Sequence, residues 1–308
     1  MCDTSFYSKI LLFGEYAILK NSRGLSIPYR LYKGSLKFGE LKKKKVKESN
    51  NILVRFCEYI ECISIKNKFD LTKMKTDIKS GLYFESSIPI GYGIGSSGAL
   101  VAALYEKYYS DKVLIVNNLD NEKNIILKNI FSIMESFFHG ESSGLDPLNS
   151  YLNSPILINS KKEIEIIEIP IDNINGNKGF FLIDSGICSN THQSIDKFNE
   201  SMNDEYFRNI FESKFLDYND KCVQFFIKGN CDDLESNIKK LSRIIFKNFK
   251  FLIPINFYEV WENGLKSEDY FLKLCGSGGG GFILGFSHDL KKAKTLLSNY
   301  NFKAVHRL

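Results

Sequence analysis

Two glycine-rich segments restrict most strongly what this chain can fold into. The first, GYGIGSSGA, spans Gly91–Ala99, and the second, Gly276–Gly281, holds five glycines in six residues. Glycine loses more backbone freedom on folding than any other residue, so such runs indicate positions that require a bare backbone. A flexible linker is the alternative for the second segment, but the apolar stretch Phe282–Phe286 follows it without a polar spacer, which argues against a linker.

The first glycine segment stands between a predicted strand, Tyr83–Ile88, and a predicted helix, Ser97–Tyr109. Glycines let a backbone approach an oxyanion closely, and the first N–H groups of a helix point at it, so this order suits phosphate binding. The segment is not a Walker loop, because no Gly-Lys-Ser/Thr follows, nor a dinucleotide fingerprint, because its spacing ends in Ser-Ser. Taken alone, it leaves two alternatives: a phosphate loop, or a tight turn with Ser96 as a helix cap.

A third segment, Glu135–Asp146, contains further candidates for chemistry. At helical spacing Glu135 shares a stripe with Phe131 and Phe138, which sets its carboxylate on an apolar face. Burial of a carboxylate is tolerable when a cation lies against it, and Mg²⁺ prefers one or two carboxylates together with substrate phosphates. The alternative is an ion pair between Glu135 and a lysine at the helix surface.

Three more residues have competing interpretations. Asp146 precedes Pro147, and this pattern alone favours an N-cap aspartate in front of a proline at the first helical position. His139 is by itself more typical of a structural histidine than of a catalyst. Lys9 differs, because it stands in an apolar strand and its ammonium must reach either solvent or an acidic partner.

Composition excludes several classes of function. The 308 residues carry 41 basic and 36 acidic side chains, a net charge of +5 that is small for nucleic-acid binding by charge alone. Lys42–Lys45, the densest charge run, is expected to form a solvated hairpin or loop. No stretch is apolar for the length of a membrane span, and the seven cysteines lack zinc spacing, so we expect free thiols in the cytoplasm and neither membrane nor nucleic-acid partners.

The order of predicted elements indicates an α+β chain without internal repeats. Asp172–Lys178, a polar stretch with Gly176, marks an expected boundary between two domains, residues 1–174 and 175–308. Strands are expected on both sides of Gly14 within residues 6–19 and at 25–32, 35–41, 83–88, 155–158, 164–169, 179–184, 270–274, 282–286 and 303–307. Helices are expected at residues 51–63, 97–109, 121–138, 194–228, 232–249 and 290–299.

Four segments in this order resemble the motifs of the GHMP kinase superfamily, and within it those of the mevalonate kinases. Lys9–Leu19 is similar to the first motif, Pro89–Ala99 to the phosphate-binding second and Lys273–Gly281 to the glycine-rich third, while Glu135–Asp146 matches the segment between them. The resemblance implies two α+β lobes, an N-terminal one like ribosomal protein S5 domain 2 and a C-terminal ferredoxin-like one. It also implies ATP and Mg²⁺ and a small-molecule substrate; a homodimer is one assembly that the sequence allows.

The resemblance implies roles for individual residues. Asp146 would accept the proton of the substrate hydroxyl, Lys9 would hold Asp146 and that hydroxyl in register, and Ser97 and Glu135 would bind Mg²⁺. The implied ATP contacts are Gly91, Gly93, Ile94, Gly95, Ser96, Ser97 and Gly98. The implied substrate contacts are Glu15, Tyr16, His139, Thr191, Gly278 and Gly279.

The implied reaction is phosphorylation of (R)-mevalonate to 5-phosphomevalonate, but the motifs depart from the family pattern near the substrate. Tyr16 replaces a usual histidine, Glu141 and Ser142 replace Asn-Pro, and Cys275 and Ser277 stand where Thr and Ala are common. Phosphomevalonate, a sugar or another hydroxy acid therefore stay open as acceptors. The scarcity of basic residues near the motifs favours an unphosphorylated one. A nucleotide-sensing protein that transfers nothing is the alternative from another class.

Overall fold

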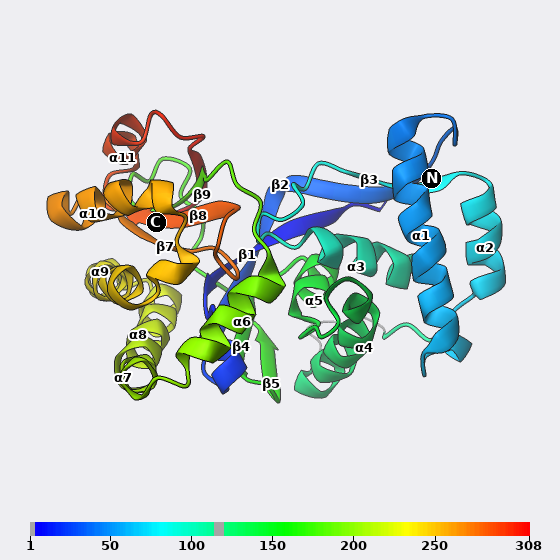
Figure 1. The fold of residues 1–308 in the computed structure, drawn as a ribbon, viewed down its shortest axis with the longest axis horizontal. Coiled ribbons are helices and arrows are strands. Elements are labelled where there is room, and N and C mark those ends of the chain that lie inside the picture. The colour runs from blue at the N-terminus through cyan, green and yellow to red at the C-terminus, as the bar shows by residue number, and fades with distance from the viewer. Residues whose placement is uncertain (1–3, 114–119) are drawn as a thin grey trace. The chain divides into compact units, whose positions relative to one another are not determined.

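The computed structural model describes residues 4–113 and 120–308 (Figure 1). Its strands are β1 (Phe6–Phe13), β2 (Gly24–Phe38), β3 (Leu82–Ser86), β4 (Ile156–Ser160), β5 (Glu163–Ile166), β6 (Gly179–Asp184), β7 (Phe271–Leu274), β8 (Phe282–Ser287) and β9 (Lys303–Arg307). Its α-helices are α1 (Lys44–Cys62), α2 (Leu71–Lys79), α3 (Ser96–Tyr108), α4 (Asn121–His139), α5 (Leu145–Leu152), α6 (Thr191–Ser201), α7 (Glu205–Ile210), α8 (Leu216–Ile227), α9 (Cys231–Asn248), α10 (Tyr258–Ser267) and α11 (Leu290–Leu296). The predicted α+β class is confirmed.

Shorter helical turns complete the described chain. They are 3₁₀ turns at Ala17–Lys20, Lys66–Lys68, Lys250–Leu252 and Ile255–Phe257, and one π-helical turn at Phe211–Phe215 between α7 and α8.

Packing divides the chain into two compact units. Unit 1 comprises Met1–Lys9, Ile27–Pro89 and Gly95–Ser154, and unit 2 comprises Ile10–Ser26, Ile90–Ile94 and Pro155–Leu308. This division by packing differs in kind from the two continuous domains expected from the sequence, residues 1–174 and 175–308, which stay a prediction.

The described residues form two sheets. The first has the order β1-β2-β4-β5, with β3 also paired to β2. Within unit 1, β2 and β3 are antiparallel, with Leu36 opposite Phe84. Within unit 2, the start of β2 pairs with β4, and β4 with β5, both antiparallel. The second sheet, in the order β7-β8-β6-β9, is antiparallel throughout and lies in unit 2.

Helix α3 forms the core of unit 1. Every residue from Gly98 to Tyr105 is buried, and a helix that is apolar on all sides must be covered on all sides. Helices α4 and α5 pack against it. The ring of Tyr105 meets Phe131 of α4 and Tyr151 of α5 edge-on, with centroids 4.9 and 5.1 Å away. The beginning of α3 is thereby held against α5, the helix that carries Asp146.

The core of unit 2 lies between its four-stranded sheet and its helices. Phe180 of β6 contacts Phe226 of α8 and Phe286 of β8, both edge-on, at centroid distances of 5.7 and 5.1 Å. Helices α8 and α9 lie side by side (Figure 1). Gly285 stands opposite Phe181 because a Cβ at that position would come within 2.2 Å of the Phe181 ring. These contacts fix β8, the strand that follows the second glycine segment.

Most expected elements from residue 83 onward are present within a few residues of their predicted bounds. The helical stretch expected at 194–228 is divided, because α6 ends at Ser201 and Asp204 caps the start of α7. Helices α2, α5 and α10 were not expected; they are short, with at most ten residues each.

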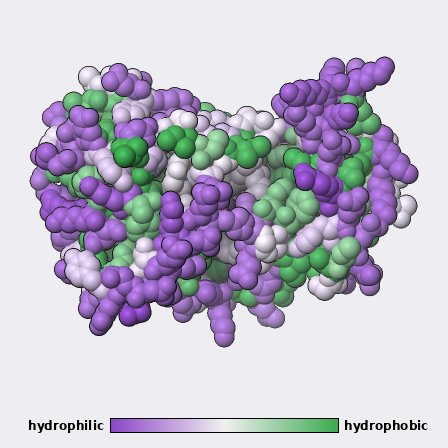
Figure 2. Space-filling view, in the orientation of Figure 1, coloured by the Kyte–Doolittle hydropathy of each residue, from purple (hydrophilic) through white to green (hydrophobic). Residues whose placement is uncertain are grey.

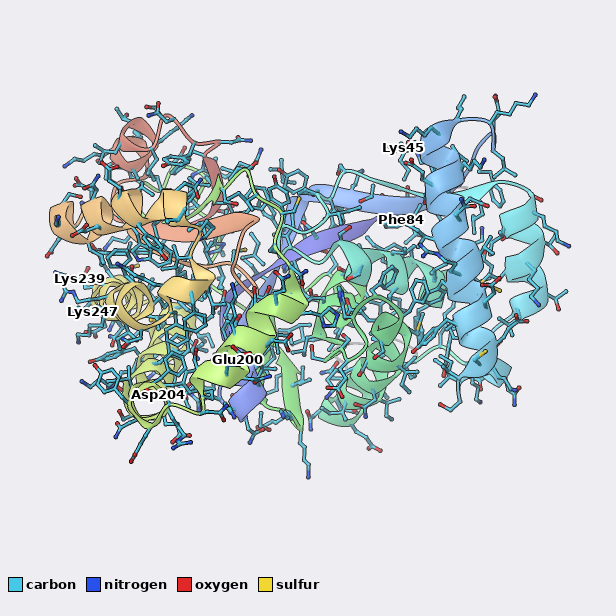
Figure 3. The ribbon with its side chains drawn as sticks, viewed as in Figure 1. Lys45, Phe84, Glu200, Asp204, Lys239 and Lys247 are labelled. Atoms are coloured by element: carbon cyan, nitrogen blue, oxygen red, sulfur yellow. The ribbon has the colours of Figure 1, made fainter. Side chains whose placement is uncertain are left out.

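Three local predictions are wrong. The turn expected between residues 32 and 35 does not form: Gly34 continues β2, since the ring of Phe84 on β3 (Figure 3) occupies the place of its side chain. The second strand expected after Gly14 is instead the 3₁₀ turn Ala17–Lys20. The lysine run is exposed, as expected, but α1 already begins at Lys44, and Lys45 lies in its first turn (Figure 3).

The face seen in Figure 2 is mainly hydrophilic, with apolar side chains scattered over it in small groups. Within the described residues no helix has the length and apolar character needed to cross a bilayer. Six cysteines are described, and all six are free thiols; the remaining one, Cys2, lies outside the described residues.

Asn50 offers a test of the packing in unit 1. Its side-chain amide is buried in α1 and donates to the carbonyls of Ile78 and Leu82, at 2.9 and 2.6 Å. We expect Asn50→Ala to lower the free energy of unfolding by about 1–3 kcal/mol, because two buried hydrogen bonds of the side-chain amide are lost. Urea denaturation measures this loss. The control is Asn51→Ala, at an exposed neighbouring position of the same helix, which should lower the free energy of unfolding by less than about 0.5 kcal/mol. Equal losses would contradict the assignment.

Candidate functional site

An ion pair between Lys9 and Asp146 is the centre of the site in unit 1. Lys9 lies on β1 with its side chain 6% exposed, and its Nζ is 2.9 Å from Oδ1 of Asp146, whose side chain is 37% exposed. Asp146 is in the first turn of α5, where the helix dipole favours a negative charge. The N-cap of that helix is Gly144, in the left-handed region at φ 73°, so the interpretation of Asp146 as an N-cap is wrong.

The start of α3 lies directly against this ion pair. A Cβ on Gly95 would be 3.1 Å from Cγ of Lys9, and a Cβ on Gly98 would be 2.7 Å from the carbonyl carbon of Asp146. Gly95, at φ 80°, is the N-cap of α3, so the interpretation of Ser96 as the cap is also wrong. The first helical N–H groups therefore point out of the helix end beside Lys9 and Asp146.

Glu135 lies within a hydrogen-bonded group of side chains in unit 1. Its carboxylate is buried, accepts a hydrogen bond from Ser97 Oγ at 2.9 Å through Oε1, and accepts a second from Ser142 Oγ through Oε2. His139 Nε2 lies 3.1 Å from the same Ser97 oxygen. The alternative of a surface pair with lysine is wrong, because Glu135 is only 4% exposed.

Burial, and to a smaller extent the negative charge of Asp146, raise the pKa of Glu135 to about 7. The serine hydrogen bonds and the ammonium of Lys9 act in the opposite direction but do not outweigh desolvation. A buried carboxylate with a raised pKa gains from a cation placed against it. Such groups cluster at functional sites more often than elsewhere.

The donor set around Glu135 suits one kind of metal. Among the described residues, no group of three or more His, Cys, Asp or Glu side chains could hold a metal ion by itself. Ser97 and Glu135 supply one hydroxyl and one carboxylate, hard oxygen ligands of the type that Mg²⁺ takes when phosphates and water complete its shell. The residues present therefore fit Mg²⁺ bound together with a phosphate ligand.

The glycine segments of unit 2 pack backbone against backbone. Gly276, Gly278, Gly279 and Gly281 all have φ between 69° and 77°, where other residues are strained. A Cβ on Gly281 would be 2.6 Å from Cα of Tyr92, and a Cβ on Gly93 would be 2.5 Å from the carbonyl oxygen of Cys275. The requirement for a bare backbone is therefore steric, and the linker alternative is wrong.

The turn that carries these glycines connects β7 to β8 and is hydrogen-bonded in place. Gly279 N donates to the carbonyl of Leu252, and Gly281 N donates to that of Ile187 at 2.5 Å. Gly91 is held in the same unit, because its carbonyl accepts from both the N–H and the hydroxyl of Ser189.

The residues expected to contact substrate in unit 2 form two groups. Thr191, the first residue of α6, has its hydroxyl 3.4 Å from that of Ser277, and Ser194 Oγ donates to the carbonyl of Gly278. Glu15 and Tyr16 are instead buried and bonded to other protein groups, Glu15 to Lys273 and Tyr16 to the carbonyl of Ser277. Direct contact of these two with substrate stays a prediction.

The structure thus gathers the expected residues within each unit. Unit 1 brings together Lys9, Gly95, Ser97, Gly98, Glu135, His139 and Asp146. Ser96 begins α3, and Ile94 is 1% exposed and packed in unit 2.

Ser142 and Lys273 had no role predicted from the sequence. For Lys273 a signal was present, since a lysine within an apolar strand needs a partner, as was argued for Lys9.

Comparison with known proteins identifies the fold. No family model matches the chain, and no curated protein matches its sequence. The structure of L. major mevalonate kinase in complex with R-mevalonate matches with 14% identity and a TM-score of 0.63, covering 97% of this chain and 90% of that one. The Methanococcus jannaschii mevalonate kinase matches with 18% identity and a TM-score of 0.60, covering 99% and 98%. The Streptococcus pneumoniae phosphomevalonate kinase with phosphomevalonate and AMPPNP matches with 13% identity and a TM-score of 0.64, covering 100% and 99%.

This chain has the fold of the GHMP kinase superfamily. The GHMP kinase fold extends over essentially the full length, which confirms the two-lobed α+β class expected from the motifs. The identities of 13–18% show the fold alone, and the matched proteins are named for two different substrates.

Ser142 gives a test of the site that does not depend on the acceptor. Its hydroxyl holds Oε2 of Glu135, leaving Oε1 toward Ser97. We expect Ser142→Ala to weaken Mg²⁺ binding in the presence of ADP about tenfold, because partners that orient a metal ligand are worth that much. Calorimetric titration measures it.

Ser143→Ala is the matched control, since the hydroxyl of Ser143 accepts only from the N–H of Leu145 among the hydrogen bonds described for it. Ser142→Thr keeps a hydroxyl and should restore most of the affinity. Equal Mg²⁺ affinity in the Ser142→Ala and Ser143→Ala proteins would show that Ser142 does not orient Glu135.

Proposed function

We propose that this chain is an ATP-dependent kinase that phosphorylates a hydroxyl group of a small molecule. The observation that carries the proposal is the 2.9 Å ion pair of Lys9 and Asp146 at the beginning of α3. It combines a carboxylate that remains 37% exposed, a buried cation and the N-terminal end of a helix, which are the parts that phosphoryl transfer to an alcohol requires.

In this proposal Asp146 acts as the base. The acceptor oxygen attacks the γ-phosphorus of ATP, the bond from that phosphorus to the β,γ-bridging oxygen breaks, and ADP leaves. The hydroxyl proton passes to Asp146, late in a loose transition state, so that a carboxylate is a sufficient base. Lys9 holds the carboxylate by its ion pair and places a positive charge beside the reacting oxygens.

The nucleotide phosphates are assigned to the loop from Gly91 to Gly98. Glycine at positions 91, 93 and 95, all with φ between 75° and 80°, permits a backbone conformation that exposes N–H groups. Ser97 and Glu135 would hold Mg²⁺, which when bound supplies neutralisation of the phosphate charge.

We propose (R)-mevalonate as the acceptor, giving 5-phosphomevalonate. The motif pattern of Glu135–Asp146 and the match to a mevalonate kinase structure with R-mevalonate support it. Phosphomevalonate is the second candidate, because a phosphomevalonate kinase matches with a similar TM-score, 0.64 against 0.63. A phosphorylated acceptor requires further cations, and the two lysines described at the motifs, Lys9 and Lys273, are already bound to Asp146 and Glu15. This favours the unphosphorylated molecule.

The base assignment predicts the behaviour of Asp146→Asn. We expect kcat to fall by about 10²–10⁴, since the proton acceptor is lost, while the KM for ATP changes less than about threefold. An ADP-release assay measures both. Asp120→Asn is the control, because Asp120 is the N-cap of α4 and asparagine caps equally well. A wild-type rate in the Asp146→Asn protein would remove Asp146 from the mechanism.

The acceptor assignment predicts a ranking of substrates. ADP release by the purified protein should be fastest with mevalonate in a panel that also holds phosphomevalonate, homoserine and several sugars. Activity with a sugar and none with mevalonate would overturn the acceptor but keep the kinase. Stabilisation by ATP without transfer to any acceptor would favour the alternative of a nucleotide-sensing protein.

A further inference from the structure

The segment after β1 has an unusual backbone in unit 2. Tyr16 has φ 64° and ψ −31°, a left-handed conformation that side chains other than glycine rarely adopt. Such a conformation persists only where the surroundings hold it in place, and it is common at functional sites. Contacts of the Tyr16 side chain must therefore hold this backbone conformation in place.

Tyr16 is held at both ends of its side chain. Its ring stacks on Phe198 of α6 with centroids 4.3 Å apart, and its hydroxyl donates to the carbonyl oxygen of Ser277 at 2.5 Å. Burial, and to a smaller extent the charge of Glu15, raise the pKa of this hydroxyl, so it remains a protonated donor. The ring and hydroxyl of Tyr16 thus connect α6 to the turn between β7 and β8.

The preceding residue, Glu15, is anchored to β7, the strand that leads into this turn. Glu15 Oε1 is 2.6 Å from Nζ of Lys273, and both side chains are 5% exposed or less. Lys273 Nζ also donates to the carbonyl of Leu274 at 3.0 Å. Glu15 therefore fixes the end of β7, and Tyr16 fixes Ser277, three residues beyond the last residue of that strand.

The turn held in this way presents polar groups at the surface of unit 2. The hydroxyl of Ser277 lies 3.4 Å from that of Thr191, and the two residues are at least partly exposed. Gly279 is exposed as well. The carbonyl of Ser277 belongs to the peptide that leads into Gly278, so the bond from Tyr16 sets the direction of this peptide.

We infer that Tyr16 is a positioning residue whose hydroxyl fixes Ser277–Gly279 for contact with the acceptor substrate. The inference rests on the proposed function for the identity of that ligand. In this inference the role of Tyr16 is indirect. Its hydroxyl is hydrogen-bonded to the Ser277 carbonyl, and the groups that contact the acceptor belong to the turn. Loss of the hydroxyl frees the Ser277 carbonyl while the stacked ring stays in place.

Tyr16→Phe tests this, and Tyr270→Phe is a matched control. Tyr270 is also buried in unit 2 and donates its hydroxyl to a backbone carbonyl, that of Val260 at 2.8 Å, but outside the glycine turn. Amide hydrogen exchange of a peptide covering residues 275–282 should become about tenfold faster in Tyr16→Phe and stay unchanged in Tyr270→Phe. Equal exchange in the two variants would overturn the positioning role.

Kinetics then test the ligand. In Tyr16→Phe the KM for the acceptor should rise about fivefold while the KM for ATP stays within twofold, and in Tyr270→Phe both should stay within twofold. A rise in the KM for ATP alone would overturn the assignment of the turn to the acceptor. If the wild-type protein phosphorylates no acceptor, the proposed function fails, and the exchange measurement still decides the positioning role.

Discussion

The ion pair of Lys9 and Asp146 is the interaction on which the site in unit 1 depends. An ammonium with 6% exposure on an apolar strand is strongly unfavourable without a partner, and Asp146 is that partner at 2.9 Å. The pair requires α5 to begin beside β1. Gly98 permits this, because a side chain there would collide with the backbone of Asp146. The charge of one buried lysine therefore determines where a loop, two helices and a strand meet.

Glycine has the same organising effect in unit 2, through sterics instead of charge. The turn Gly276–Gly281 and the loop at Gly91 and Gly93 approach so closely that a single Cβ would force them apart. Left-handed φ values at four of these glycines add a second constraint. Two independent requirements at the same positions explain why the chain accepts the entropic cost of five glycines in six residues.

The sequence predicted the elements with strong periodicity and, through the family motifs, the pairs Lys9–Asp146 and Ser97–Glu135, which the structure places in contact in unit 1. The roles of these residues stay predictions. Lys9 and Glu135 were recognisable in the sequence because each places a charged side chain in an apolar pattern. A charge buried in this way needs a partner. Asp146 was not recognisable from its pattern alone, since Asp-Pro also describes an N-cap; the contact with Lys9 is non-local and leaves no local trace. The interruption expected between the strands at 25–32 and 35–41 was wrong, because the ring that fills the space beside Gly34 comes from Phe84, fifty residues away.

The two carboxylates of unit 1 show how one site can assign different tasks to the same group. Glu135 is almost fully buried and held by two serine hydroxyls, so it can bind a cation but cannot meet an acceptor. Asp146 keeps 37% of its side chain exposed and is bound to Lys9 through Oδ1, so that in the proposed mechanism its carboxylate accepts a proton. In the proposed mechanism these environments separate a metal ligand from a base. Neither proposed role depends on the rest of the acceptor, so the proposed reaction rests on unit 1, whereas the proposed choice of substrate rests on the polar turn of unit 2.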